Sequence, residues 1–292
     1  MNNWSDDVNQ NMKLTTIQPT QLPAPKNYQE VEQARAIAEI QGALVSAQVC
    51  PRDIQYTERM IENECSLPEF AALVEYKLPV GGKDHYGASI RTMEMIAGYY
   101  GNIRSGYEEI RWGKDDQGTF TDCKAIAWDL KTNNFQFIPF RVYHFIITKK
   151  EGKKEIKDPF EISRLIRNHA ARAQREALKK VIPRYLVQKA IKIARETVLA
   201  KIKSGQSLPE IVRNMLKQFA ILGVKQDQLE KYVGTTYENF TAEHVADLRA
   251  VYRSIVEDEC DASEFFDIDN KSKSKPKAKA ELDDLLKETG DA

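Results

Sequence analysis

The residues that could do chemistry in this chain are cations spaced along one predicted helix. Residues 158–183 read DPFEISRLIRNHAARAQREALKKVIP, in which Asp158 can cap the helix, Pro159 suits its first position and Pro183 ends the run. At about 100° per residue, five polar residues fall within about 80° of one another and five apolar residues fall opposite them. The polar set is Arg164, Asn168, Arg172, Arg175 and Lys179, and the apolar set is Ile162, Ile166, Ala170, Ala173 and Ala177. The pattern predicts one face packed on a flat surface and one cationic face, unless the helix is simply a solvated amphipathic one.

Further cations and an aromatic residue extend this candidate binding surface. A phosphate backbone is held by several cations on a rigid track, and bases stack on aromatic side chains. The lysine-rich loop 149–157 and the segment around residues 86–91 offer both kinds of group. The candidate nucleic-acid contacts added there are Lys149, Lys150, Lys153, Lys154, Arg91 and Tyr86. For the aromatic residues, core packing is the alternative reading.

Signs of catalysis are weak. The four histidines lie in four different segments, and no HExxH-type metal spacing occurs. The stretch KLPVGGKDHYGASIR lacks the GxxxxGK[ST] motif of a phosphate-binding loop. Residues 87–89 at the start of a helix could still hold one phosphate on their backbone N–H groups. The alternative is that Ser89 only caps the helix. Acidic residues near the predicted strands leave a metal-dependent nuclease as a weaker alternative; these are Asp115, Asp116, Asp122 and Asp129. We therefore expect a binding protein, not an enzyme, with no catalytic residue, cofactor or metal.

Charge is balanced overall but unevenly distributed. The chain has 292 residues, with 43 Lys and Arg against 43 Asp and Glu. Residues 149–203 hold 17 basic and six acidic side chains, whereas residues 257–269 hold seven acids and no base. A basic middle region predicts a polyanionic partner. Scattered cysteines, no signal peptide and no long apolar run predict a soluble cytoplasmic protein that does not enter a membrane.

The periodicity predicts an α+β fold. Helices are expected at residues 28–49 and from Pro51, then a strand at 73–79, a VGGKDH turn and a helix at 88–100. Three antiparallel strands follow at 103–112, 120–130 and 135–148, joined by short turns, and then the cationic helix and a second basic helix ending near residue 203. The last strand is apolar on both faces, so it is either buried on both sides or shows aromatic residues to a ligand. Pro139 indicates that it lies at an edge or carries a bulge.

Four regions are expected along the chain. Residues 1–26 form a disordered lead-in, 27–203 the binding core, 205–256 a small separate helical module, and 257–292 an acidic and linker tail. The tail ends in ELDDLLKE, a short amphipathic stretch that would order only on a partner surface.

Two stretches resemble known phage proteins. YGASIRTMEMIAGYYGNI, followed by RNHAARAQREALKKVIP, resembles a phage and prophage group of single-strand annealing proteins. In that group a Gly-x-Ser-Ile-Arg-x-x-Glu helix precedes a three-stranded sheet and an Asn-x-x-Ala-Arg-x-x-Arg helix. The matching residues here are Gly87, Ser89, Ile90, Arg91 and Glu94, then Asn168, Ala171, Arg172 and Arg175. LKQFAILGVKQDQLEKYVG and the segment after it look like a C-terminal part of some RecT-type recombinases.

The resemblance covers roughly residues 70–267 and implies a β-β-β-α annealing fold of the RecT and Red-beta type. It also implies ring or filament oligomers and ATP-independent pairing of single-stranded DNA during phage-type homologous recombination. An exonuclease and a host single-strand binding protein would be the protein partners. The rival interpretation is a nucleic-acid-binding scaffold or accessory protein that does not anneal.

Overall fold

The computed structural model describes residues 28–80, 83–148, 152–204, 207–256 and 262–266. Its contacts divide the chain into two units, Met1–Pro51 and Arg52–Ala292. The described part of the first unit, residues 28–51, consists mainly of helix α1, Tyr28–Val49, whose side chains are mostly exposed. The sequence pattern predicted this helix as part of the core at 27–203, whereas the contacts place it in a separate unit. The predicted lead-in, residues 1–26, lies outside the described residues.

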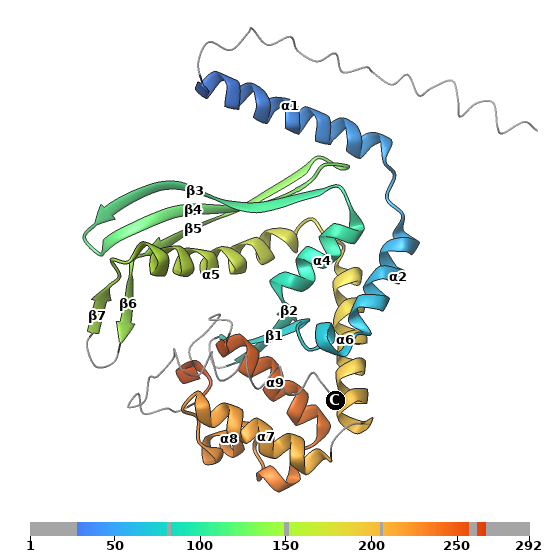
Figure 1. Ribbon diagram of the computed structural model, residues 1–292, viewed down its shortest axis with the longest axis vertical. Coiled ribbons are helices and arrows are strands. Elements are labelled where there is room, and N and C mark those ends of the chain that lie inside the picture. The colour runs from blue at the N-terminus through green and yellow to red at the C-terminus, as the bar shows by residue number, and fades with distance from the viewer. Residues whose placement is uncertain (1–27, 81–82, 149–151, 205–206, 257–261, 267–292) are drawn as a thin grey trace, which may run out of the picture. The chain divides into compact units, whose positions relative to one another are not determined.

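In the second unit, a three-stranded antiparallel sheet and helix α5 pack on each other as two layers (Figure 1). The strands are β3 (Ile103–Asp115), β4 (Gly118–Asp129) and β5 (Asn134–Tyr143), in the order β3-β4-β5. Helix α5 (Pro159–Leu178) covers one face of the sheet, where Ile166 packs against Cys123 and Val142. This confirms the predicted α+β class and places β5, with Pro139, at the sheet edge.

The third predicted strand is shorter than expected. It ends at Tyr143, and a separate hairpin follows, β6 (Phe145–Thr148) with β7 (Gly152–Glu155). His144 marks the break, because its N–H donates to the Thr119 carbonyl and its own carbonyl accepts from Ile156. Part of the lysine-rich segment is therefore a strand and not a loop.

A second hairpin and helix α4 precede the sheet in the chain. Strand β1 (Glu75–Val80) pairs with β2 (Lys83–Ala88), so the region predicted as a VGGKDH turn is partly strand. Helix α4 (Ile90–Tyr100) starts at Ser89, whose hydroxyl accepts from the Thr92 N–H, and stops at Gly101 with φ of 74°. The stop at Gly101 follows the sequence prediction, because a left-handed φ favours glycine.

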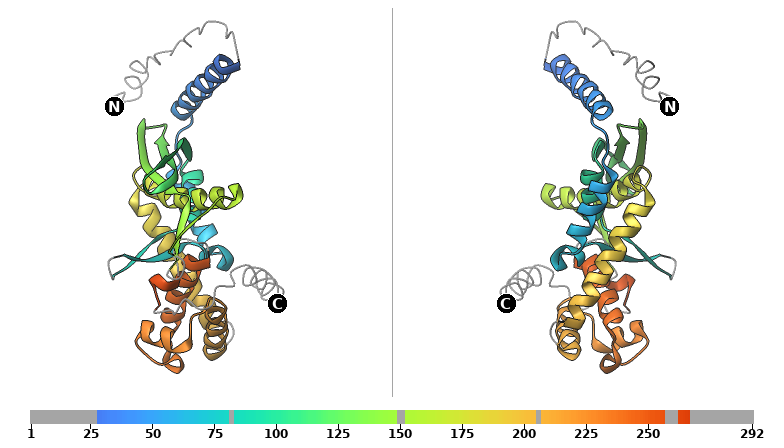
Figure 2. Two further views of the ribbon diagram at one scale, coloured as in Figure 1. Left: turned by 90° about the vertical axis from the view of Figure 1, so that its left-hand side faces the viewer. Right: turned by 90° about the vertical axis from the view of Figure 1, so that its right-hand side faces the viewer.

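The remaining helices build one continuous hydrophobic core. They are α2 (Ile54–Cys65), α3 (Pro68–Ala71), α6 (Arg184–Ser204), α7 (Leu208–Ile221), α8 (Gln226–Val233) and α9 (Ala242–Val256). The short turns η1 (Tyr237–Asn239) and η2 (Ala262–Glu264) complete the described elements. Buried residues of α2, α4, α6, α7 and α9 belong to the same cluster, and α9 also packs on β1 (Figures 1 and 2).

Helices α7–α9 are therefore not the separate module that the sequence suggested. Phe219 of α7 is fully buried and contacts the rings of Tyr252 and Phe266 at centroid distances of 5.4 and 5.6 Å. Phe266 lies in the segment predicted as an acidic tail, so residues 262–266 belong to the folded unit. Residues 267–292, including the ELDDLLKE stretch, lie outside the described residues.

Candidate nucleic-acid interface

The outer face of α5 carries the predicted row of polar residues, with one exception. Asp158 caps the helix and Pro159 opens it, as predicted. Arg164 is exposed and ion-paired with Glu161 at 2.7 Å, and Lys179 is exposed and paired with Glu176 at 2.7 Å. Asn168 and Arg172 are half-buried between them. Exposed ion pairs of this kind are weak, so these cations remain available to a polyanion.

Arg175 is the exception, because it is buried and not part of an open cationic face. Only 2% of the residue is exposed, and its guanidinium carbon lies 3.7 Å from the ring centroid of Tyr76. Tyr76 comes from β1, so at this point the hairpin β1–β2 covers the face of α5 that turns away from the sheet. The expectation that Arg175 lies free on the cationic face is wrong, because the sequence of one helix does not reveal which tertiary neighbour covers it.

The contact between Tyr76 and Arg175 requires a glycine. Tyr76 pairs with Gly87 across the hairpin, and a Cβ at Gly87 would lie 2.8 Å from the Tyr76 ring. The bare backbone of Gly87 thus leaves room for the ring, which takes the Arg175 guanidinium on it as a cation–π contact. Lys179 extends this contact, with its Nζ 5.9 Å from the same ring.

The other face of the hairpin holds a second cation between tyrosines. Lys77 and Tyr86 are cross-strand partners, and the Lys77 Nζ lies 4.8 Å from the Tyr86 ring and 4.9 Å from the Tyr232 ring of α8. Lys77 is 4% exposed, and its backbone N–H donates to Ser254 of α9 at 3.1 Å. Tyr86 itself is 46% exposed. An aromatic ring held by a cation on one side and open to solvent suits base stacking.

Arg91 and the lysine segment lie on other elements. Arg91 is exposed in the first turn of α4. Lys153 and Lys154 are exposed on β7; Lys153 donates to the Gln117 carbonyl and lies 4.2 Å from the Phe145 ring centroid. Lys149 and Lys150 lie outside the described residues. The possible phosphate site at residues 87–89 is not available, because Ser89 is 2% exposed and already caps α4.

Three of the four acidic residues considered for a nuclease, Asp115, Asp122 and Asp129, are engaged with arginines. Asp122 accepts from Arg111 at 2.9 Å and from Arg141 at 2.6 Å, and hydrogen bonding by Arg141 holds the pKa of Asp122 below its usual range. Asp129 binds Arg52. Among the described residues, no group of three or more His, Cys, Asp or Glu side chains could hold a metal ion.

The two buried cysteines, Cys65 and Cys123, show no sign of a nucleophile. Burial raises the pKa of the Cys65 thiol to about 12 and that of Cys123 to about 11. Both side chains lie in the hydrophobic clusters described above. A buried thiol with a raised pKa stays protonated, as expected for a structural cysteine.

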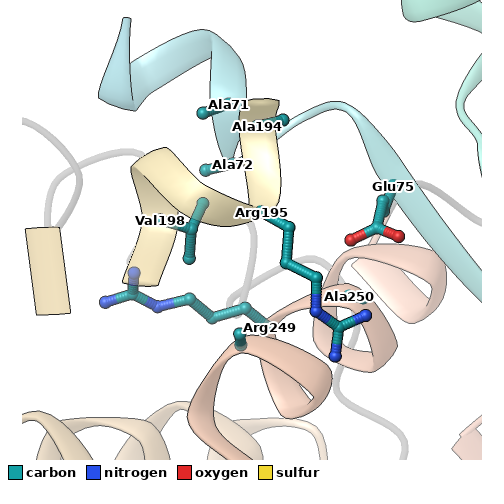
Figure 3. Close-up of a pocket in the computed structure, with 9 residues that line it drawn as sticks. Ala71, Ala72, Glu75, Ala194, Arg195, Val198, Arg249 and Ala250 are labelled. Carbon is teal, nitrogen blue, oxygen red and sulfur yellow. The ribbon is translucent and has the colours of Figure 1, made fainter. Parts of the chain in front are cut away.

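A small cavity lies where β1, α6 and α9 meet (Figure 3). Its volume is about 30 Å³, and alanines and Val198 form much of its lining, beside Glu75, Arg195 and Arg249. Arg195 donates to Asp247 at 2.9 Å, and burial raises the pKa of Glu75. The two arginine side chains point to opposite sides of the cavity (Figure 3). The cavity is a packing junction between α6 and α9 and does not gather the cations of the α5 face.

The structure adds residues that sequence reasoning missed. Tyr76 and Lys77 are adjacent in one strand and face opposite ways, so the hairpin presents one to α5 and the other to α8. Arg167 is an exposed cation on α5, between Arg164 and Asn168 in sequence. For Tyr76 and Lys77, two features of the sequence were informative: the alternation of side chains in EYKLP and the glycine that lies opposite Tyr76 in the hairpin.

Comparisons with known proteins return nothing: no family model, no curated protein and no solved structure matches this chain. The resemblance to annealing proteins thus rests on the sequence motifs. Within the described part of the chain, no helix has the length and apolar character needed to cross a bilayer.

Proposed function

We propose that this protein binds single-stranded DNA along the outer face of α5 and anneals complementary strands without ATP, in phage-type homologous recombination. The function is one of binding and not of bond-making catalysis. Cations hold the phosphates of one strand, the bases stay accessible, and a complementary strand pairs with them. We place the protein in the cytoplasm, as a ring or filament of identical subunits working with a phage exonuclease and a host single-strand binding protein.

The observation that carries this proposal is the row of cations on α5, beside the hairpin β1–β2. Arg164, Arg167 and Arg172 lie on α5, and Lys179 directly follows its last residue, so this helix carries a row of cations. Such a row on a rigid helix is the phosphate-binding component of sequence-independent single-strand binding. Tyr86 is 46% exposed, but it shares the hairpin face of Lys77, opposite to Tyr76, and is therefore not part of the α5 surface. The cation–π contact between Arg175 and Tyr76 fixes the hairpin against the helix.

Arg172→Glu tests the proposed interface. Because phosphate contacts carry no base information, the variant should weaken binding of oligothymidylate and mixed-sequence strands alike. It should also reduce the slope of log K against log salt by at least about 0.7, the value for one phosphate contact. Fluorescence anisotropy of a labelled oligonucleotide at several salt concentrations measures both quantities.

Lys192→Glu is the matched control, since Lys192 is exposed on α6 and lies outside the α5 face. Both variants make the same charge change, and circular dichroism checks that both stay folded. Equal weakening by the two variants would show that net charge, and not the α5 face, sets the affinity, and the proposed interface would then be wrong.

A further inference from the structure

The three-stranded sheet has one covered face and one open face. In β4, Ala125 and Ala127 are fully buried on the side of α5, whereas the alternate residues Ile126 and Trp128 point to the opposite side. Ile126 pairs with Phe137 of β5, and Trp128 pairs with Phe135. Phe135 is 47% exposed and Phe137 is 56% exposed, so large apolar side chains face solvent on the side of the sheet opposite to α5.

The exposed rings form a continuous strip on this face. The Trp128 and Phe135 centroids are 5.8 Å apart with the rings perpendicular, and the Phe135 and Phe137 centroids are 6.4 Å apart with an angle of 37°. The spacing of 6.4 Å is about twice the 3.4 Å rise per nucleotide of a stacked strand. Neighbouring rings along β5 therefore suit the bases of a strand that is extended beyond its stacked form.

Cations lie beside these rings. Arg104 of β3 pairs with Trp128 in the register, so its side chain lies on the same face, and it is exposed with no partner within the described part of the chain. Lys124 lies two residues before Ile126, on the same face of β4. It forms an ion pair with Glu108 at the surface, and such exposed pairs are weak. The aromatic end of the face thus carries two cations and one carboxylate.

We infer that this open sheet face is a second binding site for single-stranded nucleic acid, with bases stacked on Trp128, Phe135 and Phe137 and phosphates held by Arg104 and Lys124. An antiparallel sheet that displays aromatic side chains with adjacent cations is a stacking platform, because every base has a π-face. Aromatic rings on a sheet face beside an arginine that has no partner among the described residues favour this occupant over an apolar helix.

This inference rests on the proposed function and adds a site to it. The cations of α5 turn away from the sheet, because the apolar side of that helix covers the sheet. A strand on the open face is therefore separate from a strand on the outer face of α5. One subunit would then hold two strands at once, one on each side of the layer formed by α5 and the sheet.

Photocrosslinking tests the site in the unaltered full-length protein. An oligothymidylate that carries 5-iodouracil crosslinks to aromatic side chains with which the base stacks, and mass spectrometry identifies the peptide. The expected result is crosslinks within residues 128–137. If crosslinks form elsewhere in the protein but not there, the sheet site is wrong and the α5 interface stands. If the chain does not bind the oligonucleotide at all, the proposed function fails as well.

The double variant Phe135→Ala with Phe137→Ala measures the contribution of the rings. Loss of stacking should weaken binding of the oligonucleotide by roughly 5-fold to 150-fold per stacked base, with the salt slope unchanged because the phosphate contacts remain. Tyr185→Ala is the matched control, since Tyr185 is 47% exposed on α6. Unchanged binding by the double variant overturns the inference. Subunits that separate on sedimentation with unchanged binding per protomer would identify the face as a protein interface, which also overturns it.

Discussion

At the scale of residues, two cations buried against tyrosines decide how the candidate site is built. Arg175 and Lys77 are 2% and 4% exposed, yet each lies against tyrosine rings. Removing a charged side chain from water is costly, and a ring face offsets only part of that cost. These two residues therefore act mainly to fix the hairpin between α5 and α8, and the strand-binding cations are their more exposed neighbours.

The glycine opposite Tyr76 gives a direct test of this arrangement. Gly87→Ala would place a Cβ 2.8 Å from the Tyr76 ring, so the ring must move away from Arg175. We expect the free energy of unfolding to fall by about 1–3 kcal/mol, the usual cost of overpacking, and the affinity for single-stranded DNA to fall with it. Urea unfolding and anisotropy titration measure the two effects.

Gly98→Ala is the matched control for that change. Gly98 lies in α4, and an added Cβ there meets nothing within 4 Å. Because alanine is the better helix former, the free energy of unfolding of this variant should rise by up to about 1 kcal/mol, and its affinity for single-stranded DNA should be unchanged. A Gly87→Ala protein as stable as its parent would mean that Tyr76 adapts freely and that the contact with Arg175 does not fix the hairpin.

At the scale of elements, the sheet depends on one buried ion pair at the end of β4. Arg52 donates to Asp129 at 3.0 Å and also to the Gly101 carbonyl at the end of α4. The pair thus joins the start of the folded unit to both the sheet and α4. Burial alone would raise the pKa of Asp129, but the hydrogen bonds from Arg52 and Thr132 outweigh it, and the pKa is lowered.

Asp129→Asn should therefore cost stability in a pH-dependent way. A folded pKa below the unfolded value of about 3.9 means that the carboxylate stabilises the protein at neutral pH, and that this contribution is lost as the pH falls below about 4 toward the lowered pKa. We expect the free energy of unfolding of the variant to be about 3 kcal/mol lower than that of the parent at pH 7, because Arg52 loses the charged partner of a buried pair. At pH 3 the difference between the two proteins should be smaller. Urea unfolding of both proteins across this range measures it; a constant difference would contradict the assignment.

The sequence predicted elements more reliably than their contacts. Periodicity located α4, the three strands and α5, and Pro139 indicated the edge strand, because these signals are local. Burial of Arg175 could not be predicted, since it depends on a hairpin about 90 residues earlier in the chain. The ambiguous strand at 135–148 illustrates the same limit: Phe135 and Phe137 proved exposed, whereas Phe140 packs against the buried cluster under α5. The sheet partners that decide this lie elsewhere in the sequence.

At the scale of the whole molecule, the shared core determines which truncations leave a folded protein. Helices α7–α9 belong to the same hydrophobic core as α6, and α9 packs on β1, whereas α1 belongs to a separate unit. A chain that ends at Ser204 should lose its cooperative thermal transition and aggregate, because apolar surface of α6 becomes exposed. Removal of residues 1–51 should leave the transition within a few degrees of its original temperature.

Circular dichroism on heating compares the two truncated chains with the intact one. Deletion of residues 1–51 serves as the control for shortening the chain as such. A cooperative transition in the chain that ends at Ser204, near that of the intact protein, would show that α7–α9 fold as an independent module after all.

The central claim is that this protein pairs complementary strands by binding alone. The most direct measurement is the rate at which two complementary oligonucleotides with donor and acceptor dyes anneal, without ATP and with a chelator that removes divalent metal. We predict a rate well above that of spontaneous pairing, which falls steeply as salt rises and is lost in Arg172→Glu but kept in Lys192→Glu. Strands that are bound without faster pairing, or that are cut when Mg²⁺ is restored, would contradict the account.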